Sequence, residues 1–519
     1  MTIRYVLFVG LITPPLVTGC ATPPDPEPRA AITEHQVQLA SARVETGVPV
    51  TLPEEPFLDG PQDVDFFVQI ALERNPEILA AQRGVAAQAN VIPQVTALDD
   101  PVLTDTFQPL DNNSVQTAAG RGPNTLTVTQ KLPWLSKLRV RGEVAEQDAK
   151  IALTRLAQSE LKVIEDVKLA YYELAYNQSA IEIVESDQEL LEQLLQFAEA
   201  QYRTGTTSQQ DVLVAQVELD RLEDSLITLR RQLEQAQADL AKVVHTSPDA
   251  NLLAELDENL PPVPQQIDAL YEAAVRCRPE LQERLHAIIR EERKEELAKL
   301  NYYPDFNVGL GWQTITGDGA ISPVTNGNDN VSFMVGLTVP IWRDKLDAGV
   351  RESQNRMLES ARRYDASRDD TMRLIRRLIV QAEAIEQQIE LFEDRIIPKT
   401  EQALQVSAAD YRVNKVDFQQ ILDNWSDLLM FHLQVTRFEA NLNQTLASLE
   451  RVVGCQLATL PETQIVPIDA FEPGPALRAL EKEEPDTDPA DETGDNELGV
   501  LPIHHLHELT NSDSVFTDQ

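Results

Sequence analysis

Basic side chains are scarce in this 519-residue chain. Its 44 lysines and arginines stand against 84 aspartates and glutamates, which gives a formal net charge of −40. A surface of this charge repels nucleic acid, and no cluster of basic and aromatic residues offsets the repulsion. After the first twenty positions the chain also lacks a run of roughly eighteen apolar residues, the length that a transmembrane helix needs. We therefore expect no nucleic-acid partner and no membrane-spanning helix.

Motifs of catalysis are missing too. The chain has no glycine-rich phosphate loop, no nucleophile elbow and no HExxH sequence. His504, His505 and His507 are close enough in sequence to chelate a metal, but they stand in an acidic tail that we interpret as solvated. We predict that the protein is not an enzyme and uses no cofactor and no metal site.

Cysteine is rare, and two of the three cysteines, Cys277 and Cys455, stand far from the N-terminus. Neither has neighbours with the spacing of metal ligands. In an exported protein the two thiols could form a disulfide, or each could remain a small buried side chain. The sequence leaves this choice open.

The third cysteine ends a segment that looks like an export signal. Arg4 gives a basic start, and a mostly apolar stretch follows from Tyr5 to Val17. The sequence Val17-Thr18-Gly19-Cys20 resembles the bacterial lipobox, in which the peptide is cut before a cysteine that is then acylated. Ala21 resembles the signal for sorting to the outer membrane. We expect lipidation of Cys20, and an ordinary cleaved signal with an incidental cysteine is the alternative.

Between its two ends the sequence repeats itself once. Asn75-Pro76-Glu77-Ile78 returns as Arg278-Pro279-Glu280-Leu281, and Tyr202-Arg203 returns as Tyr411-Arg412. A repeat of this length is a tandem duplication of a whole half. We expect a signal peptide over 1–19, a lipidated proline-rich tether over 20–61, a first repeat over 62–246, a linker over 247–266, a second repeat over 267–455 and an acidic, disordered tail over 456–519.

Each repeat carries the heptads of long coiled-coil helices. Apolar residues recur every seven positions, at Leu219, Leu226, Leu233 and Leu240 and again at Leu428, Val435, Leu442 and Leu449. No proline lies between Pro133 and Pro248, so a helix from about Gly142 to Tyr202 would be roughly 90 Å long. In the second repeat Pro398 should kink the corresponding helix or be accommodated by its neighbours.

Each repeat also contains a pair of alternating segments. Apolar residues occupy every second position over 306–313 and 331–339, and less regularly over 102–109 and 125–132. This alternation is typical of a transmembrane β-barrel strand, although a half-buried soluble hairpin gives the same pattern. The segments 109–124 and 314–330 are predicted to be external loops. Four strands cannot close a barrel, and open edges are not tolerated in lipid, so we expect an oligomer.

The duplicated halves, long antiparallel helices and strand pairs resemble the TolC, or outer membrane efflux protein, family over about residues 62–455. The motifs that carry the resemblance are Asn75-Pro76-Glu77, Leu132-Pro133-Trp134, Tyr202-Arg203-Thr204-Gly205-Thr206-Thr207-Ser208-Gln209-Gln210-Asp211-Val212-Leu213 and Val339-Pro340-Ile341-Trp342. The resemblance implies a mainly α fold with a small β part. In it, a homotrimer joins an α-barrel of coiled-coil helices to a 12-stranded transmembrane β-barrel, with four strands from each chain.

The same resemblance implies a function. The protein would be a lipid-anchored outer-membrane channel with a long periplasmic extension, serving as the exit duct of a tripartite efflux pump. It would conduct solutes passively from an inner-membrane pump and a periplasmic adaptor. The amino-acid sequence of residues 202–213 favours a pump of the RND heavy-metal type.

Two sets of site residues follow from the resemblance. Residues of the helix turns are predicted to contact the adaptor, namely Tyr202, Arg203, Thr204, Gly205, Thr206, Ser208, Arg412, Val413 and Asn414. Residues of the second turn are candidates for the periplasmic aperture, namely Tyr411, Asp417, Gln420 and Asp423. Gln420 stands where the family often has an acidic residue, and Val416 where it can have a basic one, so the family's usual gate is altered here. Three copies of Asp417 around an axis would attract cations, although a solvated surface aspartate is an equal alternative.

Other readings account for less of the sequence. A periplasmic adaptor would have one helical hairpin and not two copies with inserted strands. A structural coiled-coil lipoprotein that conducts nothing would leave the alternating strands unexplained. A duct for type I protein secretion would share the whole architecture, and the sequence does not separate it from a duct for small solutes.

Overall fold

The computed structural model of the chain describes residues 60–107, 115–117, 119–256, 260–317, 320–321, 324, 327–413 and 415–455. All of these belong to one unit, Met1–Ile468. The predicted signal peptide, Cys20, most of the tether, Asn414 and the tail from residue 456 lie outside the described residues.

The first half joins three short helices to two long ones, with strands between them. The short helices are α2 (Val64–Arg74), α3 (Pro76–Ala89) and α4 (Val91–Thr96), and the long ones are α5 (Leu135–Arg203) and α6 (Gln209–Val244). Asn75 separates α2 from α3, because its backbone is extended and its side-chain oxygen caps the N–H of Glu77 at 2.9 Å. The 69 residues of α5 give it a length of about 100 Å.

The second half repeats this succession with α7 (Ile267–Cys277), α8 (Pro279–Leu300), α9 (Arg343–Leu391), α10 (Ile397–Tyr411) and α11 (Phe418–Val453). A π-helical turn, η2 (Phe392–Ile396), joins α9 to α10. Pro398 is the second residue of α10 and has no N–H to continue the α-helical bonding, so the wider turn before it accommodates the proline. Pro398 was predicted to cause such an irregularity.

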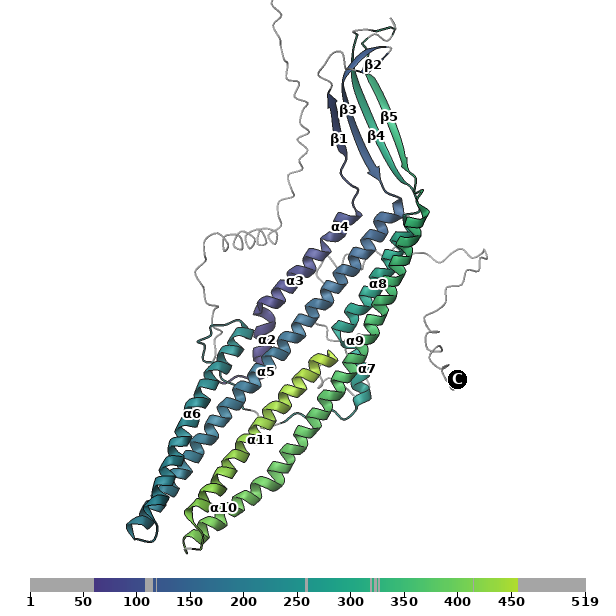
Figure 1. The fold of residues 1–519 in the computed structure, drawn as a ribbon. Coiled ribbons are helices and arrows are strands. Elements are labelled where there is room, and N and C mark those ends of the chain that lie inside the picture. Colours follow the sequence, from purple (N-terminus) through teal and green to yellow (C-terminus); the bar gives the residue numbers. More distant parts are fainter. Residues whose placement is uncertain are drawn as a thin grey trace, which may run out of the picture. The chain divides into compact units, whose positions relative to one another are not determined.

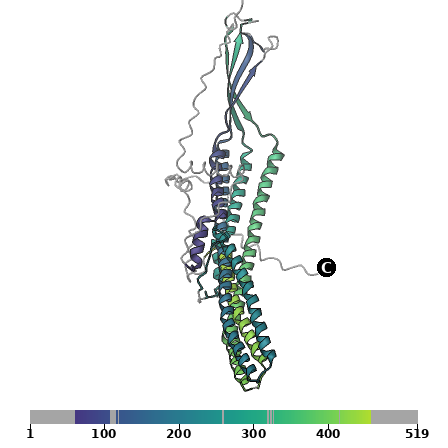
Figure 2. The same cartoon turned by 90° about the vertical axis from the view of Figure 1, so that its left-hand side faces the viewer.

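The strands and the two hairpin turns lie at opposite ends of the long helices (Figure 1). In the first half the turn joins α5 to α6, and in the second it joins α10 to α11. The view turned by 90° shows the same separation of the strands from the turns (Figure 2). No helix among the described residues has both the length and the apolar character that a membrane crossing requires.

The strands form one antiparallel sheet in the order β1-β3-β4-β5, with a short β2 beside β3. They are β1 (Val102–Phe107), β2 (Val115–Thr117), β3 (Gly120–Leu132), β4 (Asp305–Thr316) and β5 (Asn330–Thr338). The register aligns exposed apolar side chains in rows across the four longer strands, such as Leu103, Val128, Leu310 and Phe333. The adjacent row on the other face is small or polar: Thr104, Thr127, Gly311 and Ser332. This is the alternation expected of a sheet with lipid on one side and water on the other.

The predicted loop over 109–124 was partly wrong. Val115–Thr117 pairs with the start of β3, which begins at Gly120, and β4 continues to Thr316. The loop was predicted because these residues are rich in Gly, Asn, Asp and Thr, a composition typical of external loops. Antiparallel pairing satisfies their backbone N–H and C=O groups all the same, and it extends the strands beyond the apolar rows.

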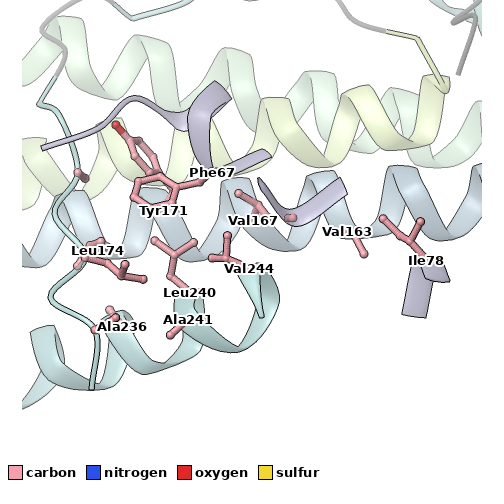
Figure 3. Packing of buried hydrophobic residues seen from close by; sticks show 14 of the residues in the cluster. Phe67, Ile78, Val163, Val167, Tyr171, Leu174, Ala236, Leu240, Ala241 and Val244 are labelled. Atoms are coloured by element: carbon pink, nitrogen blue, oxygen red, sulfur yellow. The ribbon is translucent and has the colours of Figure 1, made fainter. Parts of the chain in front are cut away.

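The core is divided among three clusters along the helices. The first packs α2 and α3 against α5 and α6, with Phe67, Leu174 and Leu240 at most 1% exposed (Figure 3). The second packs α7 against α9 and α11. The third is shared, because residues of α5 and α6 such as Leu191 and Leu222 pack with residues of α11 such as Trp425. Six of the eight predicted heptad positions lie in or against these clusters, and the other two, Leu428 and Val435, are buried as well.

A ladder of ion pairs joins α5 of the first half to α11 of the second. Arg437 bonds Glu173 through both guanidinium nitrogens, at 2.7 and 3.0 Å, and its Cζ lies 3.6 Å from the ring centre of Tyr176. Further along, Arg451 bonds Glu165 at 2.6 Å, and Lys168 pairs with Glu450. These pairs lie along the antiparallel seam between the two halves.

Candidate functional site at the hairpin turns

The turn of the first half is short and internally bonded. Gly205 has φ +74°, a left-handed conformation that favours glycine. The carbonyl of Gln201 accepts bonds from the backbone N–H of Thr206 at 3.0 Å and from the hydroxyls of Thr204 and Thr206, each at 2.8 Å. The predicted contact residues Tyr202, Arg203, Thr204, Gly205, Thr206 and Ser208 are all exposed. The turn thus presents a rigid polar loop to solvent.

The turn of the second half presents Arg412 and Val413, and Val413 is 60% exposed. The guanidinium of Arg412 lies 5.9 Å from the ring centre of Phe197 on the first hairpin. Both residues were predicted to contact a partner. Their exposure at the end of the helices leaves them accessible, and nothing in the described part of the chain covers Val413.

Tyr411 behaves differently, because it is 6% exposed and points into the shared core. Its hydroxyl lies 3.1 Å from Oγ1 of Thr207 and 3.2 Å from Oδ2 of Asp211, both on the first hairpin. The hydroxyl of Thr207 also donates to Asp211, and that of Ser208 donates to Oδ1 of the same carboxylate at 3.0 Å. One carboxylate therefore collects three hydroxyls and ties the two hairpins together.

Aromatic packing holds the phenol of Tyr411 in place. Its ring centre lies 5.9 Å from that of Phe197 and 5.5 Å from that of Phe418. Burial raises the pKa of Tyr411 above its usual value, and the nearby charge of Asp211 adds to the rise. The hydroxyl thus keeps its proton and remains a donor to Asp211.

The other three aperture candidates, Asp417, Gln420 and Asp423, lie on an exposed face of α11. Asp417 stands at the start of the helix without making a side-chain cap. Gln420 bonds Asn424 at 3.3 Å, and Gln419 bonds Asp423 at 2.7 Å. Gln420 and Asp423 are three residues apart and therefore share one side of the helix. The structure therefore separates buried Tyr411 from the three exposed polar positions.

A second polar link between the halves lies deeper in the shared core. The indole N–H of Trp425, which is 2% exposed, donates to Oδ1 of Asp187 on α5 at 3.0 Å. Burial raises the pKa of Asp187, and the bond from Trp425 opposes the rise. This link was not predicted, since neither residue belongs to a recognisable motif.

Sequence reasoning also missed the partners of Tyr411. Thr207 was not among the contact residues. Asp211 was named only as part of the motif over residues 202–213. The repeat aligns Tyr411 with Tyr202, but the alignment does not show that Tyr411 is buried beside Asp211 while Tyr202 is exposed. Among the described residues no cluster of His, Cys, Asp and Glu is arranged to hold a metal ion.

The arrangement of long paired helices, a small antiparallel sheet at one end and polar turns at the other is the TolC-like fold. Solved structures agree with this fold. CusC superposes with a TM-score of 0.64 at 16% identity, over 79% of this chain and 97% of CusC. VceC of Vibrio cholerae gives a TM-score of 0.62 at 16% identity, over 76% of this chain and 96% of VceC. The MtrE outer membrane channel of Neisseria gonorrhoeae gives a TM-score of 0.61 at 14% identity, over 79% of this chain and 98% of MtrE.

The sequence itself matches the family model of the outer membrane efflux protein over residues 67–244. No curated protein sequence matches the chain. Residues 67–244 therefore carry an outer membrane efflux protein domain, as the motifs indicated. The predicted fold class, mainly α with a small antiparallel sheet and a duplicated half, is confirmed.

Proposed function

We propose that the chain is the outer-membrane exit duct of a tripartite efflux pump and works as a homotrimer. The observation that carries the proposal is the sheet. Its outermost strands β1 and β5 leave a fraction of a barrel with exposed apolar rows on one face, including Phe333 at 85% exposure. Such edges and rows are stable in lipid only when further copies pair with them and lipid covers the apolar face.

Three copies of four strands would close a barrel of twelve, and the long helices would continue its lumen on the side of the hairpin turns. The lumen needs no chemistry of its own, because an inner-membrane pump supplies the energy and a periplasmic adaptor joins it to the turns. The exposed turn residues, from Tyr202 to Ser208 and at Arg412 and Val413, offer the adaptor a polar surface. The amino-acid sequence of residues 202–213 supports an RND pump of the heavy-metal type.

The duct would be narrowest at the hairpin turns. Asp417 is exposed just before α11, and Gln420 and Asp423 are exposed on its first turns. Around a three-fold axis each position becomes a ring, and two rings of carboxylates attract cations. The link of Tyr411 to Asp211 would hold the second hairpin against the first in the narrow state.

Single-channel conductance of the purified full-length trimer in a planar bilayer tests the proposal. We expect a small, cation-selective conductance, and we expect Asp417→Ala and Asp423→Ala to make it less selective. Glu352→Ala, which removes an exposed carboxylate on α9 far from the turns, is the matched control. A closed aperture would also prevent a folded trimer from conducting ions, so a variant with both turns shortened is measured as well. If neither protein conducts, the structural coiled-coil lipoprotein is the better account.

Lipidation of Cys20 belongs to the same proposal. Two or three acyl chains, at about 0.8 kcal/mol for each buried methylene, anchor a protein firmly. Labelling of cells with a clickable fatty acid should mark the wild-type chain and leave Cys20→Ala unmarked. An unmarked wild-type chain would show that the signal is an ordinary cleaved one.

A further inference from the structure

The two halves of the chain fasten the returning end of their helical hairpins by different means. In the first half α6 ends at Val244 beside the break between α2 and α3. The side-chain amide of Asn75, which stands in that break and is 6% exposed, donates to the carbonyl of Val243 at 2.9 Å. One buried hydrogen bond thus attaches the end of the hairpin to the start of its own repeat.

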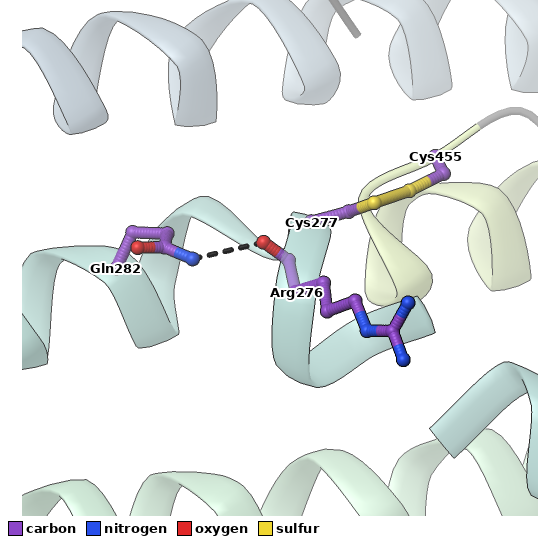
Figure 4. The surroundings of a disulfide bond; sticks show 4 residues. All are labelled: Arg276, Cys277, Gln282 and Cys455. Carbon is purple, nitrogen blue, oxygen red and sulfur yellow. Dashed lines mark hydrogen bonds between the residues drawn. A yellow bond between two sulfur atoms is a disulfide. The ribbon is translucent and has the colours of Figure 1, made fainter. Parts of the chain in front are cut away.

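The second half cannot use this bond. Arg278 occupies the position of Asn75 in the repeat, and its guanidinium turns away toward α9 and α8. It donates to Oγ1 of Thr371 at 3.0 Å and to Oε2 of Glu280 at 3.3 Å. One residue earlier, Cys277 forms a disulfide with Cys455, with their Cα atoms 6.0 Å apart (Figure 4). A covalent bond stands where the first half has a hydrogen bond.

The backbone around the disulfide is built for close approach. Gly454 ends α11 with φ +82°. A Cβ on Gly454 would lie 2.8 Å from the Cα of Arg278 and 3.0 Å from the carbonyl carbon of Cys277. Only glycine therefore allows the end of α11 to reach the break between α7 and α8. This approach buries Cys455 to 3% exposure in the core of the second half.

We propose that the Cys277–Cys455 disulfide is a clasp, closed by oxidation after export, that holds the end of α11 on the start of its own repeat. It joins residues 178 positions apart, and the loop that it closes contains the whole second hairpin and the strands β4 and β5. It takes over the role that Asn75 plays in the first half. This inference does not depend on conduction of solutes.

The oxidant is a protein disulfide of the cell envelope. One cysteine thiolate attacks that disulfide and forms a mixed disulfide, while one oxidant sulfur leaves as a thiol. The second cysteine thiolate then attacks the mixed disulfide, the Cys277–Cys455 bond forms, and the oxidant departs as a dithiol. The oxidant carries away the two electrons, and the two thiol protons balance its two new thiols.

Peptide mapping without reductant and hydrogen exchange on the full-length protein test the clasp. We expect the peptides of Cys277 and Cys455 to run as one cross-linked species. In the variant Cys277→Ser/Cys455→Ser we expect exchange over residues 446–453 to become about tenfold faster or more, with residues 240–244 unchanged. Asn75→Ala is the matched control and should speed exchange over 240–244 alone.

Two results would overturn the proposal: two free thiols in the exported protein, or unchanged exchange over 446–453 in the double serine variant. If that variant does not accumulate, the wild-type protein is compared before and after reduction with a phosphine. Gly454→Ala gives an independent test, since its Cβ would push the end of α11 from Arg278. We expect it to lower the cross-linked fraction, and an undiminished fraction would contradict the close-approach argument.

Discussion

The phenol oxygen of Tyr411 lies 3.2 Å from Oδ2 of Asp211, so a buried side chain of the second hairpin is bonded to a carboxylate on the first, 200 residues earlier. The corresponding tyrosine of the first half, Tyr202, is 47% exposed at the turn of the first hairpin. The duplication therefore produced two tyrosines with different roles. Of these two tyrosines only Tyr411 joins the hairpins, so a substitution of Tyr202 serves as the control for the same substitution of Tyr411.

Tyr411→Phe should loosen the joined hairpins. Removing one hydrogen bond costs about 1 kcal/mol, which is about fivefold for each protomer in the balance between joined and separated turns. In a planar bilayer we expect a larger mean conductance, and Tyr202→Phe should leave it unchanged. Equal effects of the two substitutions would show that the bond to Asp211 does not restrain the turns.

Trp425→Phe should destabilise the shared core in a manner that depends on pH. The substitution keeps an aromatic ring but removes the donor to buried Asp187, at a cost of about 1–3 kcal/mol when the carboxylate is charged. The pKa of Asp187 is already raised by burial. Because the protonated acid needs the donor less, we expect a greater loss of thermal stability at pH 8 than at pH 5. In an Asp187→Asn background the loss should be the same at both values.

Because of Glu160 on α5, the protein should be more stable in mild acid than at pH 8. Burial raises its pKa from 4.5 to about 7. Between these values the folded state holds a proton that the unfolded state has lost, so the free energy of unfolding falls as pH rises through this window. A shift of this size corresponds to at most about 3 kcal/mol. Thermal unfolding at pH 5 and pH 8 should show the difference, and Glu160→Gln should reduce it. An unaltered difference in this variant would assign the pH dependence to other groups.

The pair of Arg437 and Glu173 should contribute modestly to the seam between the halves. The bond from Arg437 is the largest cause of the lowered pKa of Glu173. A lowered carboxyl pKa means that its stabilisation is present above the usual value and is lost as pH falls through the folded one. Both side chains are more than a third exposed, so we expect a coupling energy of about 1 kcal/mol in a double-mutant cycle with alanine at pH 7. A coupling near zero at pH 7 would show that the stacking on Tyr176 carries the contact.

Much of the fold could be predicted because its signals are local and periodic. Heptads at Leu226 and Leu442 require helices packed along a seam, and alternation around Leu310 requires a strand with two unlike faces. Because the sequence is duplicated, the helix pattern and the strand pattern each occur twice. The ends of the strands were less certain, since backbone pairing near Gly120 leaves no trace in side-chain alternation.

Local periodicity and motifs were enough to predict the long helices, the strands, the exposed turns and the outer membrane efflux protein domain, because these signals act within a few residues of each other. Which distant groups meet depends on the tertiary structure. Tyr411 finds Asp211, Trp425 finds Asp187, and Cys277 bonds Cys455, because antiparallel helices bring together positions far apart in the chain. Such pairings depend on the register and rotation of whole helices, which many weak contacts set together. A motif specifies the residue but not the partner that the fold brings to it.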